Sequence, residues 1–155
     1  MTQLANTMPP PLPPDRPLRV LVVDDTVTYR QLVSRLLADL AGVEVVGAAA
    51  NGRIAIQKIE QTHPDLLLLD LEMPEMDGLE VLRRLRATSS EIGAIMLSGF
   101  TEAGANATLE ALKLGAFDFV LKPRGDSFDA NTRQLRDELR PKLEAFARNR
   151  TIQRL

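Results

Sequence analysis

The stretch from Pro64 to Gly78, PDLLLLDLEMPEMDG, constrains the fold more than any other part of this chain. Its apolar residues 66–69 form a continuous run, which is typical of a strand buried on both faces of a parallel sheet. The run stops at Asp70, and the residues that follow include Pro74, which cannot continue a central strand. Because ligands of open α/β sheets bind outside the carboxyl ends of the strands, we predict that Asp70 faces a binding site. An aspartate in this position can also be an ordinary turn residue, and this stretch alone leaves both interpretations open.

Short apolar runs alternate with helical patterns along the rest of the chain. We predict five strands, at residues 18–23, 43–48, 66–69, 94–97 and 117–121. Apolar residues spaced three and four apart predict helices between them, at residues 29–40, 52–61, 78–86 and 101–114. Tyr29 is the first apolar position of the first helix, which Thr26 or Thr28 can cap. Ala105, Leu109 and Leu112 are the apolar positions of the fourth helix, which Gly115 can end in the left-handed conformation. Strands that alternate with helices in this way predict a doubly wound α/β fold, in which helices cover both faces of a parallel sheet.

The two ends of the chain lie outside this alternation. Residues 1–17 hold six of the ten prolines, and we interpret them as a disordered proline-rich leader rather than as a ligand for a proline-binding domain. A last helix is predicted from about Asn131, where NTRQ resembles a capping box, towards Arg150. Pro141 should kink this helix or split it in two. The sequence therefore predicts a folded domain at residues 18–140, followed by a helical extension or linker at residues 141–155.

The composition argues against several classes of function. The 155 residues carry a formal net charge of -2 with a pI of about 5.5, so we expect no nucleic-acid partner. The absence of cysteine removes disulfides, cysteine-ligated zinc and thiol catalysis. No apolar run approaches the roughly 18 residues that span a membrane, and the N-terminus lacks the pattern of a secretory signal. We therefore expect a cytoplasmic protein that binds neither nucleic acid nor membrane.

Four of the five predicted strands end on polar or charged side chains. These side chains are Asp24 and Asp25, Asp70, Ser98, and Lys122. The carboxyl ends of parallel strands lie along one edge of a sheet, so we expect these groups to converge. Three neighbouring carboxylates repel one another and raise their own pKa values unless a cation joins them. An all-oxygen site of this kind suits Mg²⁺ or Mn²⁺.

Residues 18–123 resemble the receiver domain of two-component response regulators. The matching motifs are VVDD at 22–25, DLEMPEMDG at 70–78, Ser98 followed by Gly99, and LKP at 121–123. Within that superfamily, the motif at 70–78 and GAFDFVLKP at 115–123 look most like the N-terminal receiver of chemotaxis protein-glutamate methylesterase. The resemblance implies a flavodoxin-like sheet with the strand order 2-1-3-4-5.

The resemblance also implies how the converging residues work. Asp70 would be the phosphoacceptor, which takes a phosphoryl group from a phosphohistidine on a sensor histidine kinase. Asp24, Asp25 and Asp70 would bind the metal, together with the backbone carbonyl of Glu72. The metal and Lys122 would neutralise charge on the transferring group, so the domain would act mainly by positioning and electrostatics.

Ser98 and Phe119 are the implied switch residues. The acyl phosphate would draw the Ser98 hydroxyl towards it, and Phe119 would move into the vacated space. Each residue also has an ordinary explanation, with Ser98 as a turn former, Phe119 as a core aromatic and Lys122 as a surface charge. The family has a cis peptide bond before the residue that corresponds to Pro123, which aims the lysine inward and favours its functional role.

Three functional interpretations follow. In the first, the chain is a phosphorylation-dependent switch in chemotaxis-type signalling that catalyses only its own phosphorylation and dephosphorylation. It would change its binding to an output domain or protein partner through its last two helices and fifth strand; the oligomeric state stays open. In the second, it is the regulatory fragment of a longer methylesterase, since nothing after Pro123 offers a Ser-His-Asp triad. The third is a Mg²⁺-dependent phosphatase of the haloacid-dehalogenase type, to which Glu72 gives only a loose match.

Overall fold

Strands and helices alternate along the chain in the order that the sequence predicts. The computed structural model describes residues 16–88, 91–99 and 101–153, so the predicted leader lies almost entirely outside the described residues. The strands are β1 (Leu18–Val23), β2 (Val43–Ala49), β3 (Leu66–Asp70), β4 (Gly93–Ser98) and β5 (Asp118–Leu121). The helices are α1 (Val27–Ala38), α2 (Gly52–Thr62), α3 (Gly78–Ala87), α4 (Glu102–Lys113) and α5 (Phe128–Gln153).

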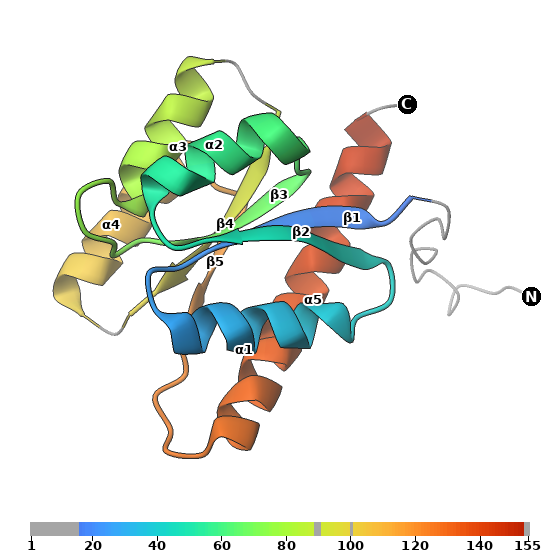
Figure 1. Cartoon of the computed structure of the whole chain (residues 1–155), viewed down its shortest axis with the longest axis vertical. Coiled ribbons are helices and arrows are strands. Elements are labelled where there is room, and N and C mark those ends of the chain that lie inside the picture. Colours follow the sequence, from blue (N-terminus) through green and yellow to red (C-terminus); the bar gives the residue numbers. More distant parts are fainter. Residues whose placement is uncertain (1–15, 89–90, 100, 154–155) are drawn as a thin grey trace, which may run out of the picture.

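All the strands pair in parallel in the order β2-β1-β3-β4-β5, which confirms the predicted topology. Helices α1 and α5 cover one face of the sheet, and α2, α3 and α4 cover the other (Figure 1). Each face has its own hydrophobic core. The predicted doubly wound, flavodoxin-like architecture is therefore confirmed.

The continuous apolar run in β3 supplies both cores at once. Successive side chains of a strand point to opposite faces. Leu66 and Leu68 accordingly pack with α1 and α5, whereas Leu67 and Leu69 pack with the helices on the other face. Every residue of β3 is buried, which explains why the run shows no polar alternation.

Polar side chains fix where most of the helices begin. Asn51 accepts a hydrogen bond from the backbone N–H of Ile54 at the start of α2, and Asp77 and Thr101 cap α3 and α4 in the same way. Thr26 occupies the N-cap of α1, as predicted, but its side chain makes no cap hydrogen bond. The predicted left-handed glycine after α4 is confirmed, because Gly115 has a φ of 94°.

Helix α5 begins earlier than predicted. Ser127 precedes it, and its hydroxyl accepts a hydrogen bond from the backbone N–H of Ala130 at 3.2 Å. Asn131, the predicted cap, lies inside the helix, where its side chain donates to the carbonyl of Gly125 at 2.8 Å. The predicted capping box at Asn131 is therefore wrong, since a serine four residues upstream already serves the helix end.

Helix α5 continues through Pro141 to Gln153, so of the two predicted effects of this proline, a kink or a split, the split is wrong. Leu139 lies before the proline and Leu143 and Phe146 after it, and all three are buried in the same core. Packing on both sides of the proline compensates for the one backbone hydrogen bond that it removes. Residues beyond 140 thus contribute to the hydrophobic core of the domain.

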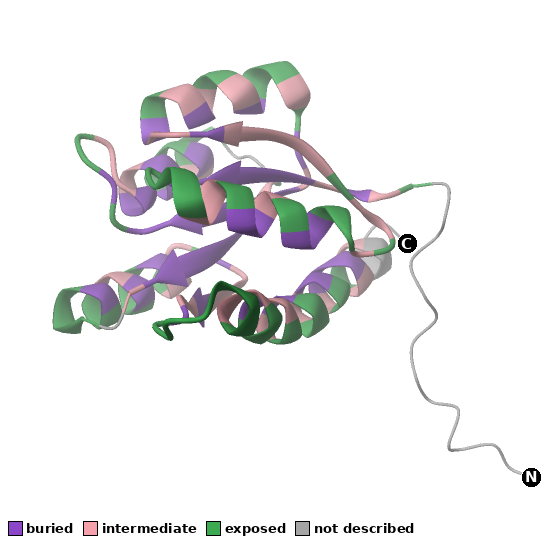
Figure 2. Ribbon diagram, turned by 60° about the horizontal axis from the view of Figure 1, so that its bottom comes forward, coloured by how far each residue is buried: buried purple, intermediate pink, exposed green. Residues whose placement is uncertain are grey.

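Helix α4 departs from its predicted buried face at Leu109, although Leu112, another predicted position, packs against the core. Leu109, predicted to face the core, is 59% exposed, and the buried positions are Gly104, Thr108 and Ala111. Figure 2 shows the general arrangement, with buried strands in the middle and exposed outer faces on the helices. No helix among the described residues is both long and apolar enough to cross a membrane.

Candidate functional site

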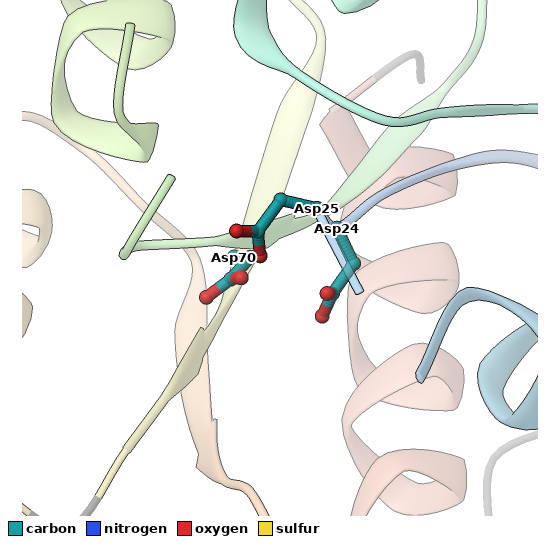
Figure 3. A group of neighbouring side chains, drawn as sticks. All are labelled: Asp24, Asp25 and Asp70. Carbon is teal, nitrogen blue, oxygen red and sulfur yellow. The ribbon is translucent and has the colours of Figure 1, made fainter. Parts of the chain in front are cut away.

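Three carboxylates meet at the carboxyl ends of β1 and β3. Asp24, Asp25 and Asp70 each offer one oxygen, and these oxygens all lie within 4.8 Å of one another (Figure 3). Asp24 and Asp70 are buried, whereas Asp25 is exposed. Asp24 and Asp25 follow β1 directly, and Asp70 is the last residue of β3, which pairs with β1. The sheet topology thus brings together the three acids that the sequence singled out.

Lys122 enters this cluster from the end of β5. Its Nζ atom lies 2.9 Å from Asp24 Oδ2 and 3.2 Å from Asp70 Oδ2, and its side chain is only 17% exposed. There is no cis peptide bond among the described residues, so the bond before Pro123 is trans here and differs from the cis bond noted for the family. The lysine reaches the acids from a trans bond.

The backbone around the acids holds their other oxygens in place. Asp24 Oδ1 accepts a hydrogen bond from the backbone N–H of Thr26 at 2.8 Å, and Asp70 Oδ1 accepts one from Glu72 at 3.1 Å. Gly78 lies against the backbone of Asp70, where an added Cβ would come within 2.4 Å of the carbonyl oxygen. Gly78 is therefore required by this close approach of the backbone.

The cluster has more negative than positive charge, and its pKa values reflect this. The pKa of Asp70 is raised to about 7, chiefly by burial and also by the charge of Asp24, against the lowering effects of Lys122 and the Glu72 N–H. Burial lowers the pKa of Lys122, but the hydrogen bond and charge of Asp24 and the charge of Asp70 outweigh it and leave that pKa raised. The lysine therefore stays protonated, and it is shared between two buried acids.

The donor set fits a hard divalent cation. Asp24 Oδ2 is buried, and within the described part of the chain its partner is the Lys122 ammonium at 2.9 Å. Carboxylate oxygens are the ligands that Mg²⁺ prefers, and it uses few of them while keeping several waters. Glu72 lies two residues after Asp70. The hydrogen bond that its backbone N–H donates to Asp70 Oδ1 keeps its main chain next to the carboxylates.

Ser98 ends β4 and is 1% exposed. Its Oγ accepts a hydrogen bond from the Thr108 hydroxyl at 3.0 Å and lies 3.4 Å from the carbonyl oxygen of Gly104. These contacts direct the hydroxyl towards α4. Phe119 is half buried and packs against the core on that same side of the sheet. The ammonium of Lys142 lies 5.3 Å from the centre of its ring.

Two residues at the site were missed in the sequence. Thr108 was not among the predicted apolar positions of its helix, although a stripe of small residues at 104, 108 and 111 is a signal for close packing of that helix on the sheet. Tyr29 was counted as an apolar position of α1. Its hydroxyl donates to the carbonyl of Pro123 at 2.8 Å, and its ring centre lies 4.5 Å from Lys122 Nζ.

Comparison with known proteins identifies the family. The model of the response regulator receiver domain matches residues 20–129, which is well over half of the chain. The chain belongs to the receiver family. The resemblance noted in the sequence is thus confirmed, and the acidic cluster lies within the matched residues.

The relatives support the narrower similarity to methylesterase receivers. A protein-glutamate methylesterase/protein-glutamine glutaminase from Desulfotalea psychrophila is 48% identical over 129 residues, which are 83% of this chain and 35% of that protein. One from Nocardioides sp. is 49% identical over 136 residues, or 87% of this chain and 37% of that protein. The receiver thus spans about a third of the length of the curated relatives it matches.

A solved structure agrees with the sequence relatives. The crystal structure of the response regulator domain of CheB from Thermotoga maritima is 36% identical, with a TM-score of 0.75. The match covers 86% of this chain and 98% of that domain. The receiver is therefore similar in fold and in sequence to the response regulator domain of a methylesterase.

Proposed function

We propose that this receiver is a phosphorylation-dependent switch in which Asp70 accepts a phosphoryl group from a sensor histidine kinase. The observation that carries the proposal is the set of three carboxylate oxygens within 4.8 Å of one another, with one buried ammonium beside them. Asp70 is the acid of this set that ends the central strand β3.

The residues suit an in-line phosphoryl transfer. An oxygen of the Asp70 carboxylate attacks the phosphorus, the P–N bond of the phosphohistidine breaks, and the imidazole nitrogen keeps the bonding electron pair. The product is an acyl phosphate on Asp70. The Lys122 ammonium neutralises charge on the phosphoryl oxygens, and because it is already held beside Asp70 it needs little reorganisation.

We propose Mg²⁺, or Mn²⁺, as the cation of the site. Asp24, Asp25 and Asp70 would hold it with the backbone carbonyl of Glu72. When bound, the cation supplies further positive charge next to the phosphoryl oxygens. The raised pKa of Asp70 reflects the metal-free cluster, and a cation would favour the ionised carboxylate that attacks phosphorus.

We propose that Ser98 and Phe119 convert the acyl phosphate into a change of shape. The Ser98 hydroxyl would exchange its contacts with Thr108 and Gly104 for the phosphoryl group on Asp70, and the half-buried Phe119 ring would follow. Ser98→Ala is expected to accept phosphate but to lose most of the conformational response, measured as amide chemical-shift changes in β5. A full response in that variant would contradict the coupling.

The output that best suits the comparisons is control of a methylesterase domain in a longer protein. The supporting observation is that relatives up to 50% identical carry that name, while this chain spans about a third of their length. The receiver itself would catalyse only its own phosphorylation and dephosphorylation. Its partner surface would be formed by α4, β5 and α5. A parent reading frame without a methylesterase domain would favour a stand-alone switch instead.

The direct test is the intact mass of the protein after incubation with acetyl phosphate and Mg²⁺. Wild type is expected to gain one phosphoryl group, and pretreatment with EDTA should prevent this. Asp70→Asn should gain none, whereas the exposed Asp129→Asn should react like wild type. An adduct on Asp70→Asn, or no adduct on wild type with either acetyl phosphate or a kinase phosphohistidine, would contradict the proposal.

A further inference from the structure

We propose that Tyr29 is the residue that positions the Lys122 ammonium against the acids, through its ring and its hydroxyl together. This inference rests on the proposed role of Lys122 in phosphoryl transfer. Tyr29 lies in the first turn of α1, far from Lys122 in sequence, and neither the motifs nor the charge pattern of the chain point to it.

The ring of Tyr29 forms one wall around the ammonium. Lys122 Nζ lies 4.5 Å from the ring centre, which is within the range of a cation–π contact. Two other sides of the ammonium face Asp24 Oδ2 at 2.9 Å and Asp70 Oδ2 at 3.2 Å. The aromatic face therefore completes a three-sided cage for a group that would otherwise be held only by two acids.

The hydroxyl of Tyr29 fixes the backbone that carries the lysine. It donates a hydrogen bond to the carbonyl of Pro123 at 2.8 Å, and Pro123 is buried. The backbone N–H of Lys122 is bonded to the carbonyl of Ser98 at 2.8 Å, but Pro123 has no N–H with which to continue the strand pairing. The hydrogen bond from the Tyr29 hydroxyl therefore holds the backbone in place directly after Lys122.

The anchor matters because of where Lys122 lies. Strand β5 is at the edge of the sheet, and the residues after Pro123, from 124 to 127, are all exposed. A lysine has a long flexible side chain that loses much rotamer freedom when it is held in one place. Contacts that restrict both the backbone and the ammonium therefore lower the cost of presenting the charge to a phosphoryl group.

A role in the core alone does not account for Tyr29. The residues of α1 that face the sheet, such as Leu32 and Val33, are buried, whereas Tyr29 is only half buried. Its hydroxyl and ring are both used in contacts with the segment 122–123. Tyr29 is therefore placed as a link between α1 and the lysine.

Two substitutions separate the ring from the hydroxyl. Tyr29→Phe keeps the ring and loses the bond to Pro123, and Tyr29→Leu loses both. Gln31→Ala, at an exposed position of the same helix, is the matched control. The measured quantity is the rate of acyl phosphate formation from acetyl phosphate in saturating Mg²⁺, followed by intact mass. We expect Tyr29→Leu to be slower by roughly tenfold, Tyr29→Phe to recover part of that loss, and the control to match wild type.

A double-mutant cycle distinguishes positioning from a merely structural role. In a Lys122→Met background the charge to be positioned is gone, so Tyr29→Leu should cause little further loss of rate. If Tyr29→Leu slows the reaction by the same factor with and without the lysine, the tyrosine acts independently of Lys122 and the inference is overturned. An unchanged rate for Tyr29→Leu in the wild-type background overturns it as well.

Tyrosine fluorescence gives a second readout that needs no reaction. Tyr29 is the only tyrosine and the chain has no tryptophan, so its emission reports on this site alone. When Mg²⁺ is added, we expect the Lys122 ammonium to shift relative to the carboxylates and the emission of Tyr29 to change. This change should be much smaller in Lys122→Met. An equal change in Lys122→Met contradicts the contact. If wild type itself forms no acyl phosphate, the proposed function fails, whereas the fluorescence still tests the contact between Tyr29 and Lys122.

Discussion

The two ends of strand β3 each have a largely buried aspartate, but their charges are balanced in different ways. At the amino end, Asp65 Oδ1 pairs with Arg150 at 2.9 Å, and Oδ2 accepts the backbone N–H of Arg19 at 2.9 Å. At the carboxyl end, Asp70 shares the single ammonium of Lys122 with Asp24. Both Asp65 oxygens thus have a partner of their own, whereas the Asp70 end has an excess of negative charge.

This difference in charge balance distinguishes the amino end of β3, where the ion pair supports the fold, from the carboxyl end, where the unbalanced charge favours binding of a cation. Buried carboxylates stabilise a fold only when they are paired and hydrogen-bonded, and they oppose folding when they repel one another. The amino end should therefore contribute stability in any buffer. The carboxyl end should become favourable only when a cation, a proton or a substitution reduces its negative charge.

The largest expected effect is at the amino end, where Phe146 closes the core. Its ring packs edge-on to Phe117, with centroids 5.2 Å apart, and an added Cβ on Gly93 would come within 2.3 Å of it. Phe146→Ala is expected to lower the free energy of unfolding by about 3 to 5 kcal/mol, because it leaves a cavity between helix and sheet.

Urea unfolding with and without Mg²⁺ measures the Phe146 effect. The variant should keep the same Mg²⁺-dependent gain in stability as wild type, since the proposed metal site lies at the opposite ends of the strands. Loss of that gain in Phe146→Ala would show that the two ends of the strands are not independent, which would contradict the contrast between them.

Adding Mg²⁺ should have the next largest effect, and this effect belongs to the carboxyl end. A ligand that binds only the folded state, at 100 times its Kd, stabilises by about 2.7 kcal/mol. We expect a gain of this order in wild type and its loss in Asp25→Asn, which removes the exposed acid of the cluster. Asp129→Asn should keep the gain. Thermal unfolding across a Mg²⁺ titration gives the measurement, and an undiminished gain in Asp25→Asn would contradict the assignment.

The pH dependence of stability sharpens the comparison further. The pKa of Asp70 is raised to about 7, chiefly by burial, from an ordinary value of 3.8. The stability that comes from protonating Asp70 is therefore fully present below its unfolded pKa and is lost as the pH rises through about 7. In EDTA, lowering the pH from 8 to 6 should raise the free energy of unfolding by about 1 kcal/mol through this group. Asp70→Asn should lack this part of the pH dependence, and equal curves for both proteins would contradict it.

The smallest expected effect concerns the switch. Thr108→Val keeps the shape of the side chain and removes the hydrogen bond to Ser98. Because that bond holds the serine hydroxyl towards α4, its loss should favour the state in which the hydroxyl approaches the phosphoryl group by about 1 kcal/mol. The variant should bind beryllofluoride, a phosphoryl mimic, several-fold more tightly in Mg²⁺. Weaker or unchanged binding would show that Thr108 does not restrain Ser98.

The sequence was sufficient to predict the sheet and the acidic cluster. The run at residues 66–69 is apolar without alternation because its side chains enter both cores, and only a central parallel strand requires this. Polar residues at the strand ends could be placed together because topology alone brings these ends to one edge. These inferences depend on patterns that are local or that follow from the fold class.

Features that depend on packing between distant elements could not be predicted in this way. Leu109 follows an apolar pattern but is exposed, because the stripe of small residues lets α4 approach the sheet on another face. Pro141 lies inside a continuous helix because neighbouring turns are held in the core. The link from Tyr29 to Lys122 joins the first helix to the last strand, and neither residue's local sequence indicates it.

The most direct test of the contrast between the two ends is the free energy of unfolding of Asp70→Asn and Asp65→Asn in EDTA at pH 8. The two substitutions remove the same charge from the two ends of one strand. We predict that Asp70→Asn raises the free energy of unfolding by on the order of 2 kcal/mol, because it relieves a buried charge excess, and that Asp65→Asn lowers it by a similar amount, because it breaks a largely buried ion pair. A decrease of similar size in both variants would contradict the claim that the excess negative charge at the carboxyl end, and not the charge of Asp65, lowers the free energy of unfolding.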